Sequence, residues 1–246
     1  MRIEMNSCML ADVNDKENSI AACEKVFKKY TSDKVETIVL NKRFSSLDET
    51  VSEHVKQRDL SMSLLRNSNV DLSEYRILKG TMCKYSFSLF DDPEIDKLCL
   101  ENTKYLYLEF PFDKALTPED IRLVNSFVAK GKYKVIIANV EKLLFKTKFD
   151  IVEKLMKGNV LGLVSARCLE DKGLRDVVIE LFEKNYAHIL GTNLDPRAKN
   201  ICSIKKCESI IAKKLSKAAL ERILENNENV LKDYPVRDIR VNWGIV

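Results

Sequence analysis

The sequence predicts an α/β barrel built from about seven consecutive strand–helix units. Short apolar segments of strand length alternate along the chain with segments that carry helix-start signals. The chain has only 7 glycines and no GxGxxG turn, which argues against a dinucleotide-binding fold and favours a barrel. In such a barrel the polar residues that follow the strands gather at one end, so these positions are the first candidates for a functional site.

Five segments are bounded apolar runs, typical of strands that are buried on both faces. They are Val35–Leu40, Tyr105–Glu109, Lys134–Ala138, Val160–Ser165 and Ala187–Gly191. Met1–Cys8 and Tyr75–Lys79 have a weaker pattern of the same kind. Together they supply the seven strands of the expected barrel.

The helices between these strands are marked by their first residues. Ser46-Leu47-Asp48-Glu49 has the form of a capping box, with a serine followed three residues later by an acid. Thr117-Pro118-Glu119-Asp120 offers an N-cap, a proline at the first helical position and acids beside the positive end of the helix dipole. Near the C-terminus, Lys205–Lys214 and Ser216–Asn227 have periodic apolar positions and are predicted to be helices.

Length and charge narrow the class of protein. With 246 residues, of which 45% are hydrophobic, residues 1–246 are expected to form one large domain. The 41 basic and 37 acidic residues are interspersed, so the formal charge of +4 does not indicate a nucleic-acid partner. No apolar run reaches about 18 residues and the start lacks a secretory leader, so we expect a cytoplasmic protein without membrane insertion.

The cysteines and histidines do not form a familiar catalytic motif. The 7 cysteines include no CxxC pair, which indicates reduced thiols, most of them buried as small apolar side chains. None has an arginine six residues later, as the phosphate-binding loop of thiol-dependent tyrosine phosphatases requires. We interpret the 2 histidines as structural, because His54 falls in a predicted helix and His188 inside an apolar strand.

One segment carries a specific family resemblance. Residues 102–113, NTKYLYLEFPFD, closely resemble the fourth-strand region of the bacterial capsule-locus tyrosine phosphatases of the CpsB type, in the PHP superfamily. The resemblance can be followed from residue 1 to about residue 232, while the tail 232–246, with the only tryptophan, Trp243, departs from the family. It implies a distorted (β/α)7 TIM-like barrel. It also implies a cluster of divalent metals, held by histidines and carboxylates, that activates water against phosphotyrosine.

The chain departs from this family at the metal-binding motifs. Asn6-Ser7-Cys8 stands where the family has His-x-His, and Asn41-Lys42-Arg43-Phe44 where it has Thr-Pro-His-His. Gly80-Thr81-Met82 replaces Gly-Gln-Glu, and Asn139-Val140-Glu141-Lys142 replaces His-Pro-Glu-Arg. The motif after the seventh strand, Ser-Asp-Ala-His, has become Thr192-Asn193-Leu194-Asp195.

Only Glu109 keeps a ligand-type residue at its own position, although Asp195 could still offer oxygen. Amides and a thioether are poor substitutes for imidazole around a divalent ion, so the resemblance implies a degenerate site with no resident metal. The candidate residues of this site are Asn6, Cys8, Lys42, Arg43, Glu109, Asn139, Glu141, Lys142, Arg167, Asn193 and Asp195.

Three hypotheses follow. The favoured one is a pseudoenzyme that serves as a regulatory scaffold for a protein partner, such as a tyrosine kinase or its phosphotyrosine tail. In the second, cationic residues, with Arg197 as a further candidate, bind a phosphate-like ligand without turnover. In the third, a residual phosphatase for capsule or exopolysaccharide regulation holds a single Mg or Mn on oxygen ligands, with the thiolate of Cys8 as an additional ligand.

Overall fold

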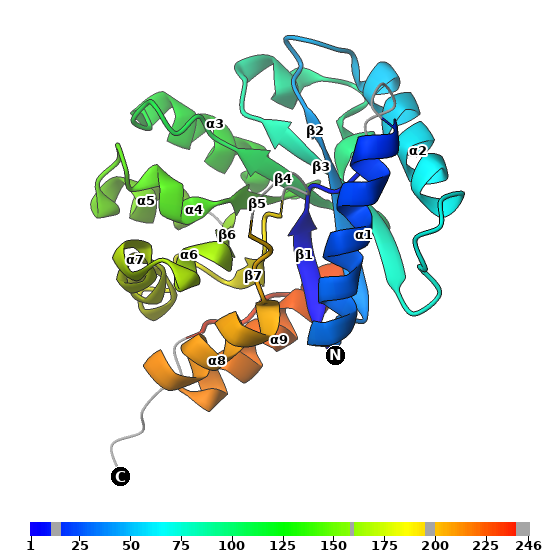
Figure 1. The fold of residues 1–246 in the computed structure, drawn as a ribbon. Coiled ribbons are helices and arrows are strands. Elements are labelled where there is room, and N and C mark those ends of the chain that lie inside the picture. The colour runs from blue at the N-terminus through cyan, green and yellow to red at the C-terminus, as the bar shows by residue number, and fades with distance from the viewer. Residues whose placement is uncertain (11–15, 158–159, 195–199, 240–246) are drawn as a thin grey trace.

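The strands form a parallel sheet that curls into a nearly closed barrel (Figure 1). The computed structural model describes residues 1–10, 16–157, 160–194 and 200–239. Each strand pairs in parallel with the next one in the sequence. Their bounds are β1 Ile3–Ser7, β2 Thr37–Phe44, β3 Arg76–Lys84, β4 Tyr105–Glu109, β5 Lys134–Ala138, β6 Val160–Ser165 and β7 Ile189–Gly191.

Helices surround the strands on the outside, and α8 and α9 lie across the end from which β1 starts (Figure 1). The α-helices are α1 Lys16–Asp33, α2 Val51–Arg66, α3 Pro118–Ala129, α4 Val140–Leu143, α5 Phe149–Met156, α6 Arg167–Glu170, α7 Lys172–Glu183, α8 Ile204–Lys214 and α9 Lys217–Leu231. Two short 3₁₀ helices, η1 Phe87–Asp91 and η2 Ile95–Leu98, lie between β3 and β4. In the part of the chain that the structure describes, no helix has both the length and the apolarity needed to cross a bilayer.

The predicted strands are all present, but several bounds differ. β4, β5 and β6 begin and end at the predicted residues, and each is a short, largely apolar run. β2 and β3 continue beyond the predicted ends to Phe44 and Lys84, since backbone pairing extends through polar sequence and aligns Arg43 with Met82. β7 begins only at Ile189, so the placement of His188 inside a strand was wrong by one residue.

One predicted helix start was also wrong. The capping box of α2 is not at Ser46 but at Thr50, whose side chain accepts from the backbone of Glu53 while Glu53 accepts from the backbone of Thr50. Ser46 lies in a turn, where its hydroxyl bonds instead to Ser86. The capping box at Thr117 is confirmed, with Asp120 as the reciprocal partner.

The barrel interior changes from apolar to polar along its axis. Side chains of alternate strand residues, among them Ile3, Met5, Tyr105 and Tyr107, pack together inside the barrel with Leu231 at the end of α9. α9 therefore closes the end where the strands begin. Polar residues occupy the opposite end, which we call the barrel mouth.

The barrel closes where β7 meets β1, through few backbone contacts. Ser7 forms an isolated parallel bridge with Leu194, and the Cys8 amide donates to the Leu194 carbonyl at 3.0 Å. Below that bridge the buried carboxylate of Glu4 accepts from the backbone amide of Thr192 at 2.8 Å. Gly191 permits the close approach, because a Cβ there would lie 2.8 Å from the Asn6 nitrogen. We call this contact the closing seam.

Candidate functional site

Asparagine side chains form a hydrogen-bonded chain across the barrel mouth. The Asn41 amide donates to Asn6 Oδ1 at 3.0 Å, and the Asn6 amide donates to Asn193 Oδ1 at 3.4 Å. Asn6 and Asn41 are fully buried, and Asn193 is held in the left-handed backbone region with φ of 49°. Asn6 both accepts and donates in this chain, while Asn41 donates and Asn193 accepts, and all three side chains are uncharged.

Local backbone features bring these asparagines together. The register of β1 against β2 shifts between Glu4 and Ser7, and this irregularity breaks the alternation of side chains along β1. Ser7 consequently faces outward and accepts from the Tyr30 hydroxyl at 3.0 Å, whereas Asn6 faces Asn41. Gly80, the partner of Asn41 in β3, leaves the space that the Asn41 amide occupies.

The retained acid, Glu109, is fully engaged by neighbouring side chains. Its Oε1 accepts from the Asn139 amide at 2.8 Å, and its Oε2 lies 3.8 Å from the Arg43 Nε. Asn139 adopts a left-handed conformation with φ of 55° at the end of β5, which directs its amide toward β4. The Arg43 side chain is 54% exposed and Glu109 16%, so solvent can reach this pair from the mouth.

A cavity of about 410 Å³ opens beside Glu109 and Arg43. Its lining residues come from the ends of β2, β3 and β4 and the segments that follow β2 and β4: Arg43, Phe44, Ser45, Asp48, Glu49, Met82, Lys84, Glu109, Phe110, Pro111 and Phe112. Most of its wall is apolar and aromatic, and its charged lining residues are two cations, Arg43 and Lys84, and three acids, Asp48, Glu49 and Glu109. The Lys142 ammonium lies 4.4 Å from the centre of the Phe112 ring and adds a third cation beside this cavity.

Glu141 does not face the mouth. Its carboxylate is buried between α4 and α6, where it accepts from the Ser165 amide at 3.4 Å and from the Cys168 thiol at 3.3 Å. Burial raises the pKa of Glu141 to about 7, and the hydrogen bonds and the charge of Lys142 offset only part of that effect. Glu141 therefore lies behind the residues of the mouth and does not reach it.

The remaining candidates are scattered. Lys42 points to the outer face of β2, where its charge contributes to lowering the pKa of His54. Arg167 is exposed at the start of α6. Cys8 is partly buried, and its sulfur lies 4.0 Å from Asn6 Oδ1. Asp195, like Arg197 and Trp243, lies outside the described residues.

Sequence reasoning missed two residues that organise the site. Asn41 was noted only as part of a replaced motif, yet it is one end of the asparagine chain and donates to Asn6. Glu4 supports the closing seam, and burial raises the pKa of this carboxyl. An acid between Ile3 and Met5 in a strand was the available signal, because a charge in a buried strand needs dedicated partners.

The histidines are partnered within the fold, as their structural interpretation requires. His54 contacts Glu49 at 3.0 Å and Thr81 at 3.3 Å, and burial lowers its pKa. His188 accepts from the Gly162 amide through Nδ1 at 3.0 Å, and burial lowers its pKa to about 4. Neither is available at the mouth.

Seven parallel strands, surrounding helices and a polar mouth at the strand ends define an α/β barrel of the TIM-like PHP type. The fold is similar to a crystal structure described as YwqE from Bacillus subtilis and CpsB from Streptococcus pneumoniae, "unique metal-dependent tyrosine phosphatases". That match has a TM-score of 0.79 and 16% identity, and covers 96% of each chain.

A sequence model of the family "Capsular polysaccharide synthesis, CpsB/CapC" matches residues 2–232. The chain belongs to the CpsB/CapC family.

Other comparisons are more distant. A dihydropyrimidinase from Brevibacillus agri aligns with a TM-score of 0.48 and 9% identity over 91% of this chain and 68% of its own. The lactonase Lmo2620 from Listeria monocytogenes aligns with a TM-score of 0.43 and 12% identity over 96% and 91%. No curated protein matches the chain at the threshold of the comparison.

The mouth fits a polynuclear metal centre poorly. Its polar groups are mainly neutral amides, and both oxygens of Glu109 already have partners. Two buried amide oxygens, Asn41 Oδ1 and Asn139 Oδ1, have no hydrogen-bond partner in the described part of the chain, but amide oxygens bind divalent ions weakly compared with imidazole or carboxylate. Among the described residues, the one cluster of His, Cys, Asp and Glu suited to an ion lies at α6 and α8.

Proposed function

We propose that this chain is a non-catalytic member of the CpsB/CapC family that binds a phosphorylated ligand at its mouth. The observation that carries the proposal is the state of Glu109, which is held by an asparagine amide and an arginine rather than left open for a metal. The Arg43 guanidinium lies 3.8 Å from the Glu109 carboxylate and supplies the positive charge that a metal ion would otherwise supply.

The absence of hydrolysis follows from the chemistry of the donors. Metal-dependent hydrolysis requires a bound ion that lowers the pKa of water from about 15.7 to about 7. The side-chain amides of Asn6, Asn41 and Asn193 are hydrogen-bonded to one another. A neutral amide cannot act as a general base, so these side chains cannot replace the hydroxide that a bound metal would generate.

Ligand binding is supported by the cavity next to this pair. Its volume of about 410 Å³ is within the usual range for small-ligand sites, and Phe44, Phe110 and Phe112 offer an apolar wall for an aromatic ring. Arg43 and Lys84 line the same cavity and can donate charge-assisted hydrogen bonds to a phosphate. A phosphotyrosine side chain combines these two chemistries, and a phosphotyrosine tail of a protein partner such as a kinase would present it.

The catalytic half of the proposal is tested by metal content and turnover. The full chain is purified with Mn²⁺ present, its metal is quantified by mass spectrometry, and release of phosphate from a phosphotyrosine peptide is followed. We expect no stoichiometric metal at the mouth and no turnover above that of Glu109→Ala. Turnover that requires added metal and is lost in Glu109→Ala would refute the proposal.

The binding half is tested by titrating the chain with paired phosphotyrosine and tyrosine peptides. A charge-assisted hydrogen bond contributes about 1.5–3 kcal/mol, so Arg43→Ala should weaken binding of the phosphorylated peptide by roughly 10- to 100-fold. Arg76→Ala is the matched control, because Arg76 is exposed at the opposite end of the sheet. Equal responses of the two variants would exclude the mouth as the binding site.

A second candidate is a residual metal-dependent phosphoesterase. Asn41 Oδ1 and Asn139 Oδ1 favour it, because each is a hard donor with no hydrogen-bond partner among the described residues, and Glu109 could join them around a single Mg²⁺ or Mn²⁺. The same metal and turnover measurements separate this candidate from the non-catalytic one.

A further inference from the structure

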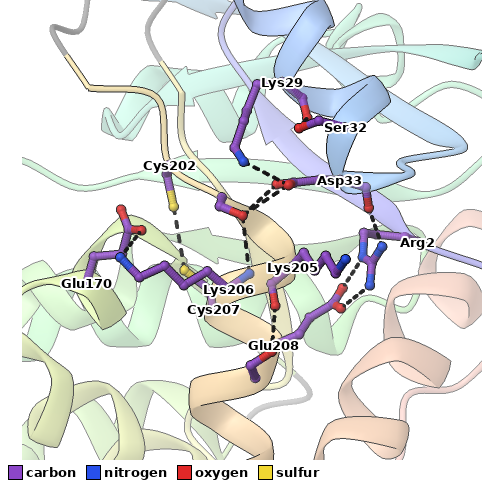
Figure 2. Close-up of polar contacts among 12 residues, drawn as sticks. Arg2, Lys29, Ser32, Asp33, Glu170, Cys202, Lys205, Lys206, Cys207 and Glu208 are labelled. Carbon is purple, nitrogen blue, oxygen red and sulfur yellow. Dashed lines mark hydrogen bonds and ion pairs between the residues drawn. The ribbon is translucent and has the colours of Figure 1, made fainter.

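Two buried thiols meet at the start of α8 (Figure 2). Cys202 lies just before the helix N-cap, Ser203, and Cys207 lies one turn into the helix. Their sulfurs are 3.6 Å apart, and the side chains are 2% and 0% exposed. Cys207 also donates to the carbonyl of Ala166 at 3.1 Å, which links this turn to the start of α6.

A carboxylate completes the group. Glu170, the last residue of α6, has an oxygen within 4.8 Å of both sulfurs. The Glu170 side chain is 27% exposed, so the cluster reaches solvent on that side. The Lys206 ammonium forms an ion pair with the Glu170 carboxylate at 3.1 Å (Figure 2). The group thus combines two soft ligands, the thiols at the start of α8, with one hard ligand, the carboxylate at the end of α6.

The spacing suits a tetrahedral ion better than a disulfide. Zinc–sulfur bonds of about 2.3 Å at a tetrahedral angle place two sulfurs about 3.8 Å apart. The sulfurs are already within a few tenths of an ångström of that separation, whereas a disulfide at about 2.05 Å would need an approach of about 1.5 Å. The corresponding sulfur–oxygen separation is about 3.6 Å, so Glu170 needs a shift of at most about 1.2 Å, within reach of a side-chain rotation.

The turn that carries both cysteines is fixed by a separate polar network. The Ser203 hydroxyl accepts from the Lys206 amide at 3.2 Å and donates to Asp33 at 2.9 Å. Within α1, Lys29 donates a hydrogen bond to Asp33 at 2.9 Å (Figure 2). The Arg2 guanidinium donates two hydrogen bonds, of 2.8 and 2.6 Å, to the Glu208 carboxylate. Anchors on both sides of the turn position the thiols before any ion arrives, which lowers the ordering cost of binding.

We propose that Cys202, Cys207 and Glu170 form a site for a thiophilic divalent cation, with Zn²⁺ as the physiological example. Both thiols lose their protons to solvent as the two sulfur–metal bonds form, Glu170 supplies one oxygen, and water fills the fourth position. Lys206 remains beside Glu170 and balances part of the negative charge of the three ligands. The ion would join α6 to α8 and leave the mouth unchanged.

Cobalt(II) is the spectroscopic probe for the test. The full chain is reduced, freed of metal and titrated with Co²⁺. We expect a sulfur-to-cobalt charge-transfer absorption that saturates at one equivalent and disappears when Zn²⁺ is added. Cys202→Ser and Cys207→Ser should each abolish it, and Glu170→Gln should weaken Co²⁺ binding at least about tenfold. Cys99→Ser, a buried thiol elsewhere, and Cys8→Ser, at the mouth, are matched controls that should retain it.

A second measurement does not depend on the folding of any variant. The wild-type chain is alkylated with N-ethylmaleimide, with and without Zn²⁺, and the modified cysteines are mapped by mass spectrometry. Zinc should slow alkylation of Cys202 and Cys207 relative to the other thiols. Absence of a charge-transfer band in the wild-type chain, a band that persists in Cys202→Ser, or Zn²⁺ that leaves both alkylation rates unchanged would overturn the site. Mild peroxide that joins the two cysteines despite bound Zn²⁺ would identify a redox pair instead.

Discussion

Replacement of the buried Glu141 by glutamine should remove a large part of the pH dependence of stability. The pKa of this carboxyl is about 7 in the folded protein, against an ordinary value of 4.5. The folded state therefore holds the proton more tightly than the unfolded state, and the resulting stabilisation is present in full below about pH 4.5. It is lost as the pH rises through about 7, where the folded protein must bury a carboxylate.

The size of the effect follows from the two pKa values. Each unit is about 1.4 kcal/mol, so between about pH 5 and pH 8 ionisation of Glu141 lowers the free energy of unfolding by about 2–3 kcal/mol. Glutamine keeps the shape and an oxygen that can accept from the Ser165 amide and the Cys168 thiol, but it does not ionise. The stability of Glu141→Gln relative to wild type should rise by that amount over this pH range.

Urea denaturation at a series of pH values, with m-values compared, provides the measurement. Differences between wild type and variant cancel the titration of all other groups, including Glu4 and the histidines. Glu221→Gln serves as the control, because Glu221 is exposed on α9 and the same change of side chain is made there without affecting a buried carboxyl. Parallel curves for wild type and Glu141→Gln would refute the reasoning.

Two further predictions concern the frame of the barrel. Gly191→Ala should lower the free energy of unfolding by about 1–3 kcal/mol, because the added methyl would lie 2.8 Å from the Asn6 nitrogen and 2.9 Å from the Asn6 Cβ. Chemical denaturation measures this loss, and an unchanged midpoint would show that the closing seam can relax. Thr50→Ala should cost about 1 kcal/mol through loss of the α2 capping box, whereas Thr50→Ser should retain nearly all of the stability; equal losses in thermal unfolding would contradict a capping role.

The strand order and the central strands were predictable because apolar runs with polar boundaries have few alternative structures. The ends of β2 and β3 were not, because Arg43 and Lys84 continue the sheet into the mouth, where solvent rather than core surrounds the inward side chains. Two consecutive capping-box patterns start at Ser46 and Thr50, and only tertiary packing of α2 decides between them.

The site was predictable as a set of strand-end positions but not as a geometry. Nothing in the sequence indicates that Asn6 turns inward while Ser7 turns outward, since this depends on the register shift in β1. Lys42 and Glu141 follow the right strands, yet local backbone conformation directs them to other layers. Cys202 and Cys207 have no motif spacing, and the fold of the first turn of α8 alone brings their sulfurs together.

The closing seam has a consequence for synthesis on the ribosome. Its contacts join residues such as Glu4 and Thr192 that are 188 positions apart, so β1 leaves the exit tunnel long before its second neighbour exists. During that interval β1 can pair with β2, but its other edge has no partner, because Leu194 and Thr192, which contact Ser7 and Glu4 in the closing seam, have not yet been made. An open sheet with one unsatisfied edge is a form that chaperones recognise and that tends to associate with other chains. Slow translation beyond β6 would prolong this interval.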